Sequence, residues 1–348
     1  MHQKKKFYDL FKARTSNRIW ILAIGGRGIG KSFSLKDVFF SDFINKGYQF
    51  ILIRRYATEL DLSFEEYFND LLKKYPGHEV KAEGGKIRTY YIDNKVAGYA
   101  LSLREIKYIK SISLDDVYNL GFEEFLPEDG VYLKLNGNPY YEVHQCFNLY
   151  QTVSRGYGKA FKKGVRFYFI ANATDYNNPY FQELGLTEKF ERGATCVKTE
   201  SIYAELIDSN DYEAIDEIKE SQFGKLIQGT RYAEYAIGNK FYNNSDNFIK
   251  GNLPGGAKHL FNIKYIEDVY GVWCDNTTGI FYITDKYDPK CKTNYALTNE
   301  AHNINTVLIE KNKNTGQIKL LREAYNMGYV MFKNSLCKYI LLTFLGIK

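Results

Sequence analysis

The stretch ILAIGGRGIGKS, residues 21–32, decides the first half of the fold. The apolar run of residues 18–24 predicts a buried strand, and the residues after it match the P-loop spacing G-x-x-x-x-G-K-[ST]. Glycines let backbone N–H groups converge on phosphates, and a helix beginning near Lys31 adds its positive end. The sequence therefore predicts a site for a nucleoside triphosphate. Its expected nucleotide-binding residues are Gly25, Gly26, Arg27, Gly28, Ile29, Gly30, Lys31 and Ser32.

Two side chains of this loop have separate expected tasks. Lys31 would reach the β- and γ-phosphates, and the Ser32 hydroxyl would bind Mg²⁺. The expected cofactors are therefore ATP and Mg²⁺.

Length and composition narrow the class of protein. The chain has 348 residues, more than most single cores hold, so we expect two domains. Its net charge of +6 is compatible with a polyanionic partner. The 31 Tyr and 24 Phe either fill cores or stack on bases and neighbouring subunits. The opening MHQKKKF lacks the apolar region of a secretory signal, and no apolar run is long enough to span a bilayer.

The five cysteines lie far apart with no C-x-x-C pair, which is typical of reduced cytosolic thiols. Residues 18–205 alternate between strand and helix patterns, with a helix expected over 63–75 and a hairpin around Asp93-Asn94. Such alternation predicts a mainly parallel sheet with ligands at the carboxyl ends of its strands. Residues 211–245 read as a charged helical linker, and the region after them is rich in strands.

The second half of an ATP site needs an acid near Mg²⁺ and a base that orients water. Glu123 and Glu124 end the apolar strand 117–122, where a Walker B pair is expected. Glu123 would contact Mg²⁺, and Glu124 would be the general base. Asp115-Asp116 is a rival pair, and two solvated glutamates at a strand end are the plain alternative.

Further polar residues lie near the predicted sheet. Asn172 ends the strand 165–171 and would either sense the γ-phosphate or cap a turn. Arg155 would either complete the active site of a neighbouring subunit or belong to a basic surface loop that touches DNA. The candidate DNA-binding residues are Arg54, Arg55, Lys159, Lys162 and Lys163.

In order along nearly the whole chain stand IGGRGIGKS, FILIRRYATEL, GFEEF, TVSR, IANA with NPYF, FGKLIQGTRY and GVWCDNTTGIFYITDKYDP. These stretches resemble the genome-packaging ATPases of small tailed phages, the phi29-like group of the FtsK/HerA lineage. The resemblance implies that Lys31 is the Walker A lysine and Glu124 the catalytic glutamate. It also implies that Arg155 is a trans-acting arginine finger and Asn172 the sensor. The family usually has Asp where this chain has Glu123.

The resemblance further implies an α/β fold in three parts. Residues 1–210 would form a P-loop ATPase domain of the ASCE type, a mainly parallel sheet with helices on both faces. Residues 211–245 would be a helical linker. Residues 246–348 would be an α+β, RNase H-like vestigial nuclease that contacts nucleic acid or the portal.

The family also implies partners and a place of action. Its members form a ring, with five subunits expected here, on the capsid portal (connector) and thread double-stranded DNA through it. A structural packaging RNA is a further expected partner. The expected location is the host cytoplasm, on the procapsid portal during assembly, with no membrane contact.

Two alternatives stay open. A terminase-like motor that also cuts DNA would need three or four clustered carboxylates, and only Asp275, Asp285 and Glu310 are candidates. A nucleotide-switched structural protein would bind ATP and hardly hydrolyse it, and Glu123 in place of Asp keeps that reading open.

Overall fold

The chain divides into two compact units, Met1–Asn243 and Asn244–Lys348. The structure is a computed structural model. The residues that it describes are 4–61, 64–85, 87–111, 113–135, 138, 140–155, 162–174, 178–191, 193–230, 233, 253–265, 267–309 and 316–347.

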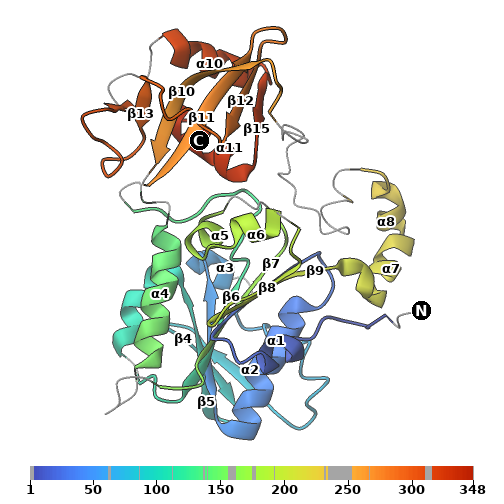
Figure 1. The fold of residues 1–348 in the computed structure, drawn as a ribbon. Helices are drawn as coiled ribbons and strands as arrows, with labels where there is room; N and C mark the ends of the chain where they lie inside the picture. The colour runs from blue at the N-terminus through green and yellow to red at the C-terminus, as the bar shows by residue number, and fades with distance from the viewer. Residues whose placement is uncertain are drawn as a thin grey trace. The chain divides into compact units, whose positions relative to one another are not determined.

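The first unit contains a nine-stranded sheet in the order β3-β4-β5-β2-β6-β7-β1-β9-β8 (Figure 1). Neighbouring strands are parallel from β5 across to β9, and β3, β4 and β8 pair antiparallel at the edges. The strands are β1 Trp20–Gly25, β2 Gln49–Arg54, β3 Val80–Glu83, β4 Arg88–Ile92, β5 Lys95–Ser102, β6 Val117–Glu123, β7 Arg166–Ala171, β8 Cys196–Lys198 and β9 Ile202–Ile207.

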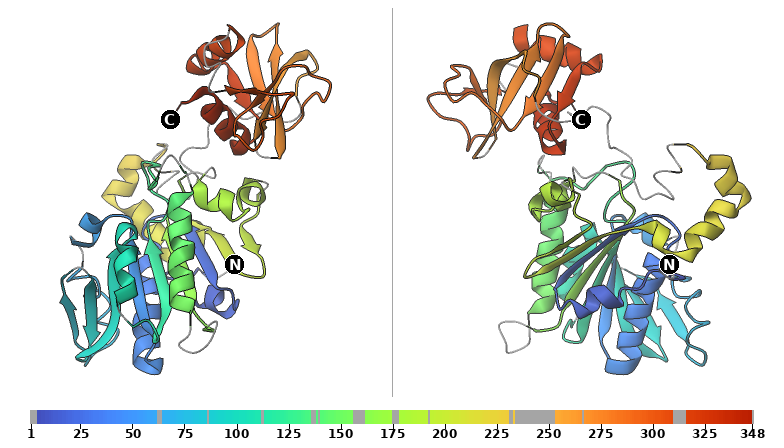
Figure 2. Two further views of the ribbon diagram at one scale, coloured as in Figure 1. Left: turned by 90° about the vertical axis from the view of Figure 1, so that its left-hand side faces the viewer. Right: turned by 45° about the vertical axis from the view of Figure 1, so that its right-hand side comes forward.

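Both faces of this sheet are buried, because side chains alternate along each strand. Trp20 and Leu22 of β1 pack in the core that includes α4, whereas Ile21 and Ala23 pack in the core that includes α2. Figure 2 shows these two helices on opposite sides of the sheet, so the predicted fold of the first half is confirmed. Its helices are α1 Phe11–Thr15, α2 Lys31–Lys46, α3 Ala57–Asp61, α4 Tyr141–Ser154, α5 Pro179–Glu183, α6 Thr187–Glu191, α7 Glu213–Glu220, α8 Gln222–Ile227 and the 3₁₀ segments η1 Leu103–Ser111 and η2 Ser209–Asp211.

Local sequence explains the hairpin but not the segment after α3. Asp93 and Asn94 take φ values of 51° and 62°, as a two-residue primed turn between β4 and β5 requires. Residues 64–75 were expected to be helical, and that expectation is wrong. Successive i→i+3 bonds such as Asn69 N–H to the Glu66 carbonyl make this segment a chain of turns. Its apolar side chains are still buried under the sheet, including Phe68.

The second unit is an α+β domain. Its six-stranded sheet has the order β14-β13-β10-β11-β12-β15, in which β10, β11 and β12 are antiparallel and the flanking strands pair in parallel. Both helices lie on one side of the sheet (Figure 2) and share its core. The elements are β10 Ala257–Tyr265, β11 Asp268–Asp275, β12 Ile280–Thr284, β13 Asn294–Ala296, β14 Val307–Leu308, α10 Gly316–Asn326, β15 Val330–Phe332 and α11 Ser335–Leu345.

The segment expected as a linker begins inside the first unit. Tyr212 and Ile215 at the start of α7, and Ile227 at the end of α8, are buried in the same core as α2. These helices therefore belong to the body of the first unit. Within the described ranges, no helix combines the length and apolar character needed to cross a membrane.

Candidate active site

The glycine-rich loop joins β1 to α2 at the carboxyl edge of the sheet. Gly28 and Gly30 have φ values of 77° and 90°, which L side chains adopt only with strain. The loop and its neighbours line a cavity of about 340 Å³, a size typical of small-molecule sites. The residues that line it are Arg27, Gly28, Gly30, Lys31, Ser32, Phe33, Glu124, Ile170, Ala171 and Asn172.

Lys31 lies at the centre of the loop and is only 7% exposed. Its ammonium donates to the Gly25 and Gly26 carbonyls at 2.9 and 2.6 Å, and to Oδ1 of Asn172 at 3.3 Å. Burial lowers its pKa to about 7, and the positive charge of Arg27 lowers it further. Phosphate oxygens beside this ammonium would restore the charged form, because an opposite charge favours ionisation.

The two predicted glutamates end β6 at the same edge of the sheet. Glu123 is 4% exposed, whereas the Glu124 side chain is 67% exposed and lines the cavity. The rival pair Asp115-Asp116 precedes β6 and is exposed. Because a parallel strand brings its carboxyl end to the loop, the rival pair lies at the far edge of the sheet. The structure thus brings Glu123, Glu124, Asn172 and Lys31 together and leaves Asp115-Asp116 out.

Glu124 has an unusual backbone. Its φ of 57° is left-handed, a conformation that costs a non-glycine residue on the order of 1 kcal/mol or more. Its N–H donates to the Ile170 carbonyl at 2.7 Å, and its own carbonyl accepts from Nη1 of Arg55 at 3.0 Å. Contacts on both sides of the residue therefore hold the strained turn that presents its carboxylate.

Sequence reasoning missed the pair that supports this turn. Arg55 is 3% exposed and Glu142 is fully buried, and the two form a bidentate ion pair with both N···O distances at 2.9 Å. Glu142 also accepts from Tyr180 and from the Leu133 N–H. The signal in the sequence was an acid in the first turn of a helix whose face is otherwise apolar.

Arg54 lies between the two glutamates. Its Nη1 is 3.3 Å from Oε1 of Glu124 and 4.0 Å from Oε2 of Glu123. The predicted DNA contacts of Arg54 and Arg55 are therefore corrected: the first is 16% exposed and faces the acid pair, and the second is buried in its pair with Glu142.

The acid pair fits a divalent cation. Oε1 of Glu123 is buried and has no hydrogen-bond partner among the described residues, and the Ser32 side chain is exposed and lines the cavity. A carboxylate and a hydroxyl are oxygen ligands of the kind that Mg²⁺ prefers. Burial of the nearby Tyr67, with a further contribution from Glu123, raises the pKa of that phenol well above its ordinary value. The phenol stays neutral beside the carboxylate.

The remaining predicted cations lie away from the cavity. Arg155 is exposed at the carboxyl end of α4, and Lys163 is exposed nearby. Lys162 is not available to DNA in this arrangement, because its ammonium donates to the carbonyls of Leu114, Asp115 and Val117. Lys159 lies outside the described residues.

The second unit does not gather acids for two metals. Asp275 accepts from the Thr277 N–H and the Thr278 hydroxyl in the turn between β11 and β12. Thr284, which precedes Asp285, pairs with Gly271 at the other end of this hairpin, about 14 Å away at 3.4 Å per residue. Glu310 lies outside the described residues, and within the described ones no three His, Cys, Asp or Glu side chains form a possible metal site.

A phosphate loop after β1, an acid pair at the end of β6 and a polar residue at the end of β7, all on one parallel sheet, define a P-loop ATPase. The comparisons identify which one. Residues 2–346 match the podovirus DNA encapsidation protein (Gp16) family, and the chain belongs to that family.

Similar proteins and structures agree with this assignment. The chain is 35% identical over 338 residues to the DNA packaging protein of Bacillus phage phi29, covering 97% of this chain and 96% of that one. It also matches the bacteriophage phi-29 viral genome packaging motor assembly at a TM-score of 0.69, with 33% identity over 96% of this chain and 97% of that one. The N-terminal domain of the phi29 DNA packaging ATPase matches 60% of this chain and 99% of its own length at a TM-score of 0.52 and 33% identity.

Proposed function

We propose that this protein hydrolyses ATP at the cavity of the first unit and uses that energy to move double-stranded DNA into a preformed capsid. Membership of the DNA encapsidation family is the observation that carries the proposal. The cavity adds support, because it joins the phosphate loop to a carboxylate on the neighbouring acid pair.

The residues of the cavity divide the chemistry. Lys31 would stabilise the charge that develops on the β- and γ-phosphates, and Asn172 beside it would contact the γ-phosphate. Glu124 would accept a proton from the attacking water, with its carboxylate aimed by the turn that Arg55 and Ile170 hold. Ser32 and Glu123 would hold Mg²⁺, which neutralises charge on the phosphates when bound.

Arg155 would act on a neighbouring subunit. α4 begins beside Arg55, through Glu142, and its 14 residues carry the chain about 21 Å before Arg155 follows. That residue is therefore far from the cavity of its own chain. An exposed cation at the opposite edge of the sheet suits an arginine finger given in trans within a ring.

The similarity to a packaging motor assembly supports action as an assembly. We infer a ring of five identical subunits seated on the capsid portal in the host cytoplasm, with a structural packaging RNA as a further partner. Lys163 and Lys159 are the candidate cations of the predicted set that stay open for DNA.

The test is ATP turnover with and without double-stranded DNA. Wild-type protein should show DNA-stimulated hydrolysis, and Lys31→Ala should lower it at least ~10²-fold, since one buried cation on the developing charge is lost. Lys46→Ala is the matched control, because Lys46 ends the same helix and pairs with Asp42 instead. Turnover of Lys31→Ala within a few-fold of wild type would contradict the proposal.

A further inference from the structure

The first unit holds an exposed aromatic ring beside the phosphate loop that the chemistry above does not use. We propose that Phe7 is the stacking platform for the base of the nucleoside triphosphate. This inference rests on the proposed function of the loop and deepens it, because it assigns the part of the site that binds the nucleoside.

Sheet order fixes the direction in which the nucleotide lies. Glu124 follows β6 and Asn172 follows β7, and both strands lie on one side of β1. A γ-phosphate directed at these residues leaves the α-phosphate and the nucleoside on the other side of β1, toward β9. The segments on that side are the N-terminal arm, residues 4–10, and α7.

The arm lies directly on the loop. Its Tyr8 N–H donates to the Ile29 carbonyl at 2.7 Å, and its Leu10 N–H donates to Oγ of Ser34 in α2 at 2.9 Å. Phe7 contacts Gly30 so closely that a Cβ added to that glycine would lie 3.0 Å from Cβ of Phe7 and 3.3 Å from its ring. Its side chain is thus held at the last glycine of the loop.

Phe7 is fixed and yet exposed. Tyr8 and Leu10 are buried, at 5% and 0% exposure, whereas 48% of Phe7 is exposed. Phe33, the residue after Ser32, is 37% exposed and lines the phosphate cavity. The nucleoside therefore leaves the loop beside exposed aromatic surface on the arm and on the first turn of α2.

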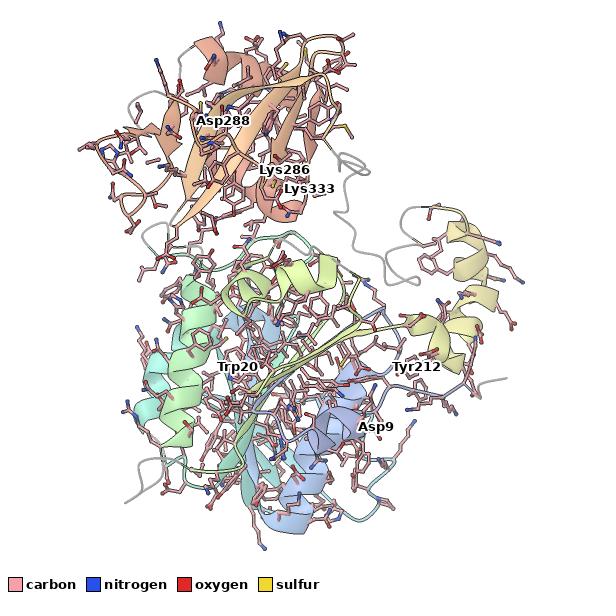
Figure 3. The ribbon with its side chains drawn as sticks, viewed as in Figure 1. Asp9, Trp20, Tyr212, Lys286, Asp288 and Lys333 are labelled. Atoms are coloured by element: carbon pink, nitrogen blue, oxygen red, sulfur yellow. The ribbon has the colours of Figure 1, made fainter. Side chains whose placement is uncertain are left out.

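The arm is anchored a second time, to α7. The backbone of Lys5 bonds with the Asp211 carbonyl and the Glu213 N–H, and the rings of Tyr8 and Tyr212 lie 6.2 Å apart. Figure 3 shows Asp9, two residues beyond Phe7, and Tyr212 on the same side of the first unit. These contacts hold the platform in place before any nucleotide binds, so little ordering opposes stacking.

The ligand class follows from the chemistry. A phenyl ring offers a π-face and no hydrogen-bonding group, so it accepts any base and adds affinity without selecting among bases. Phe7 thus favours nucleoside phosphates over inorganic polyphosphates. Losing one stacked base corresponds to about 5- to 150-fold in affinity.

The experiment compares ADP with inorganic pyrophosphate, which fills the loop but has no base. Dissociation constants are measured by calorimetry on the full chain with Mg²⁺ present. Phe7→Leu keeps an apolar contact with Gly30 and removes the π-face, and Phe7→Trp keeps a π-face. Phe11→Ala is the matched control, because Phe11 is 65% exposed on α1 just beyond the arm.

We expect Phe7→Leu to weaken ADP about 5- to 150-fold and to leave pyrophosphate unchanged. Phe7→Trp should bind ADP like wild type, and Phe11→Ala should alter neither ligand. Equal losses for both ligands, or no loss for ADP, would overturn the platform while leaving the loop intact. If Lys31→Ala failed to weaken pyrophosphate, the phosphate site itself would be misassigned, whatever Phe7 does.

Discussion

The two units of the chain place different polar groups at the centre of their sheets. The first unit buries charges beside β2 and β6, in Lys31, Glu123 and the pair of Arg55 with Glu142. The second unit buries neutral Asn262 on β10, which bonds to Asn294, to His259 and to the Asp288 carbonyl. Asp288 is labelled in Figure 3.

The difference extends to how well these groups are satisfied. Four buried side-chain atoms lack a hydrogen-bond partner among the described residues, and all four belong to the first unit. They are Nη1 of Arg54, the hydroxyls of Tyr67 and Tyr168, and Oε1 of Glu123. Burying such groups costs free energy, so a site keeps them where a ligand or a reaction uses them. The comparison teaches that the first unit is built for chemistry and the second for a self-contained fold.

Arg155 gives the largest expected effect on this comparison. An arginine finger contributes on the order of 10³–10⁵ to turnover, so Arg155→Ala alone should be nearly inactive. Mixed with Glu124→Gln, some activity should return, since a site with intact Glu124 borrows Arg155 from the Glu124→Gln subunit beside it. The measurement is ATPase rate against mixing ratio in exchanging rings. Mixed rings without any recovery would make Arg155 a surface cation.

Glu124→Gln should still bind ATP while its hydrolysis falls by about 10²–10⁴, because an amide does not accept the proton of water. Asp116→Asn is the matched control at the opposite end of β6 and should leave turnover unchanged. Single-turnover hydrolysis and nucleotide binding are measured on both variants. The reverse pattern would move the Walker B acids to the rival pair.

Breaking the pair of Arg55 with Glu142 should destabilise the first unit. Arg55→Met leaves a buried carboxylate without its cation, which costs about 3–5 kcal/mol. Lys4→Ala removes the exposed pair with Asp216 and should cost ~1 kcal/mol or less.

Urea unfolding measures both changes. A double variant, Arg55→Met with Glu142→Leu, should recover stability but not turnover, because the Glu124 carbonyl still lacks its donor. Full turnover in that double variant would show that the pair has no positioning role.

The smallest effect is expected in the second unit. Asp275→Asn keeps the acceptor that bonds to Thr277 and Thr278, so ATP turnover should stay at the wild-type rate. Neither protein should cut DNA in Mg²⁺ or Mn²⁺, because a single acid does not hold two metals. Metal-dependent nicking by wild type that disappears in Asp275→Asn would give the second unit an activity and remove the contrast between the units.

Several features could be predicted from the sequence because their causes are local. The loop spacing, the apolar runs and the Asp93-Asn94 turn depend on residues that are neighbours along the chain. A strand that ends in Glu123-Glu124 places those acids at the loop as soon as the sheet is parallel. The order of β1, β6 and β7 then brings Asn172 to Lys31.

Other roles depended on tertiary contacts that no local pattern contains. Arg54, Arg55 and Lys162 look like surface cations in the sequence, yet each is held by groups 45 to 87 residues away in the chain. The helical spacing of residues 64–75 predicts buried apolar side chains correctly and the backbone wrongly, since burial under the sheet does not require an α-helix.

By itself, the sequence determined that this protein has a P-loop on a parallel sheet and which residues end the strands beside it. Only the tertiary structure decided which cations are buried, which carboxylates lie apart and which exposed ring adjoins the loop. Spacing records contacts between residues a few positions apart. The arm that brings Phe7 to Gly30 is fixed by bonds to residues near 210, and such contacts exist only once the chain has folded.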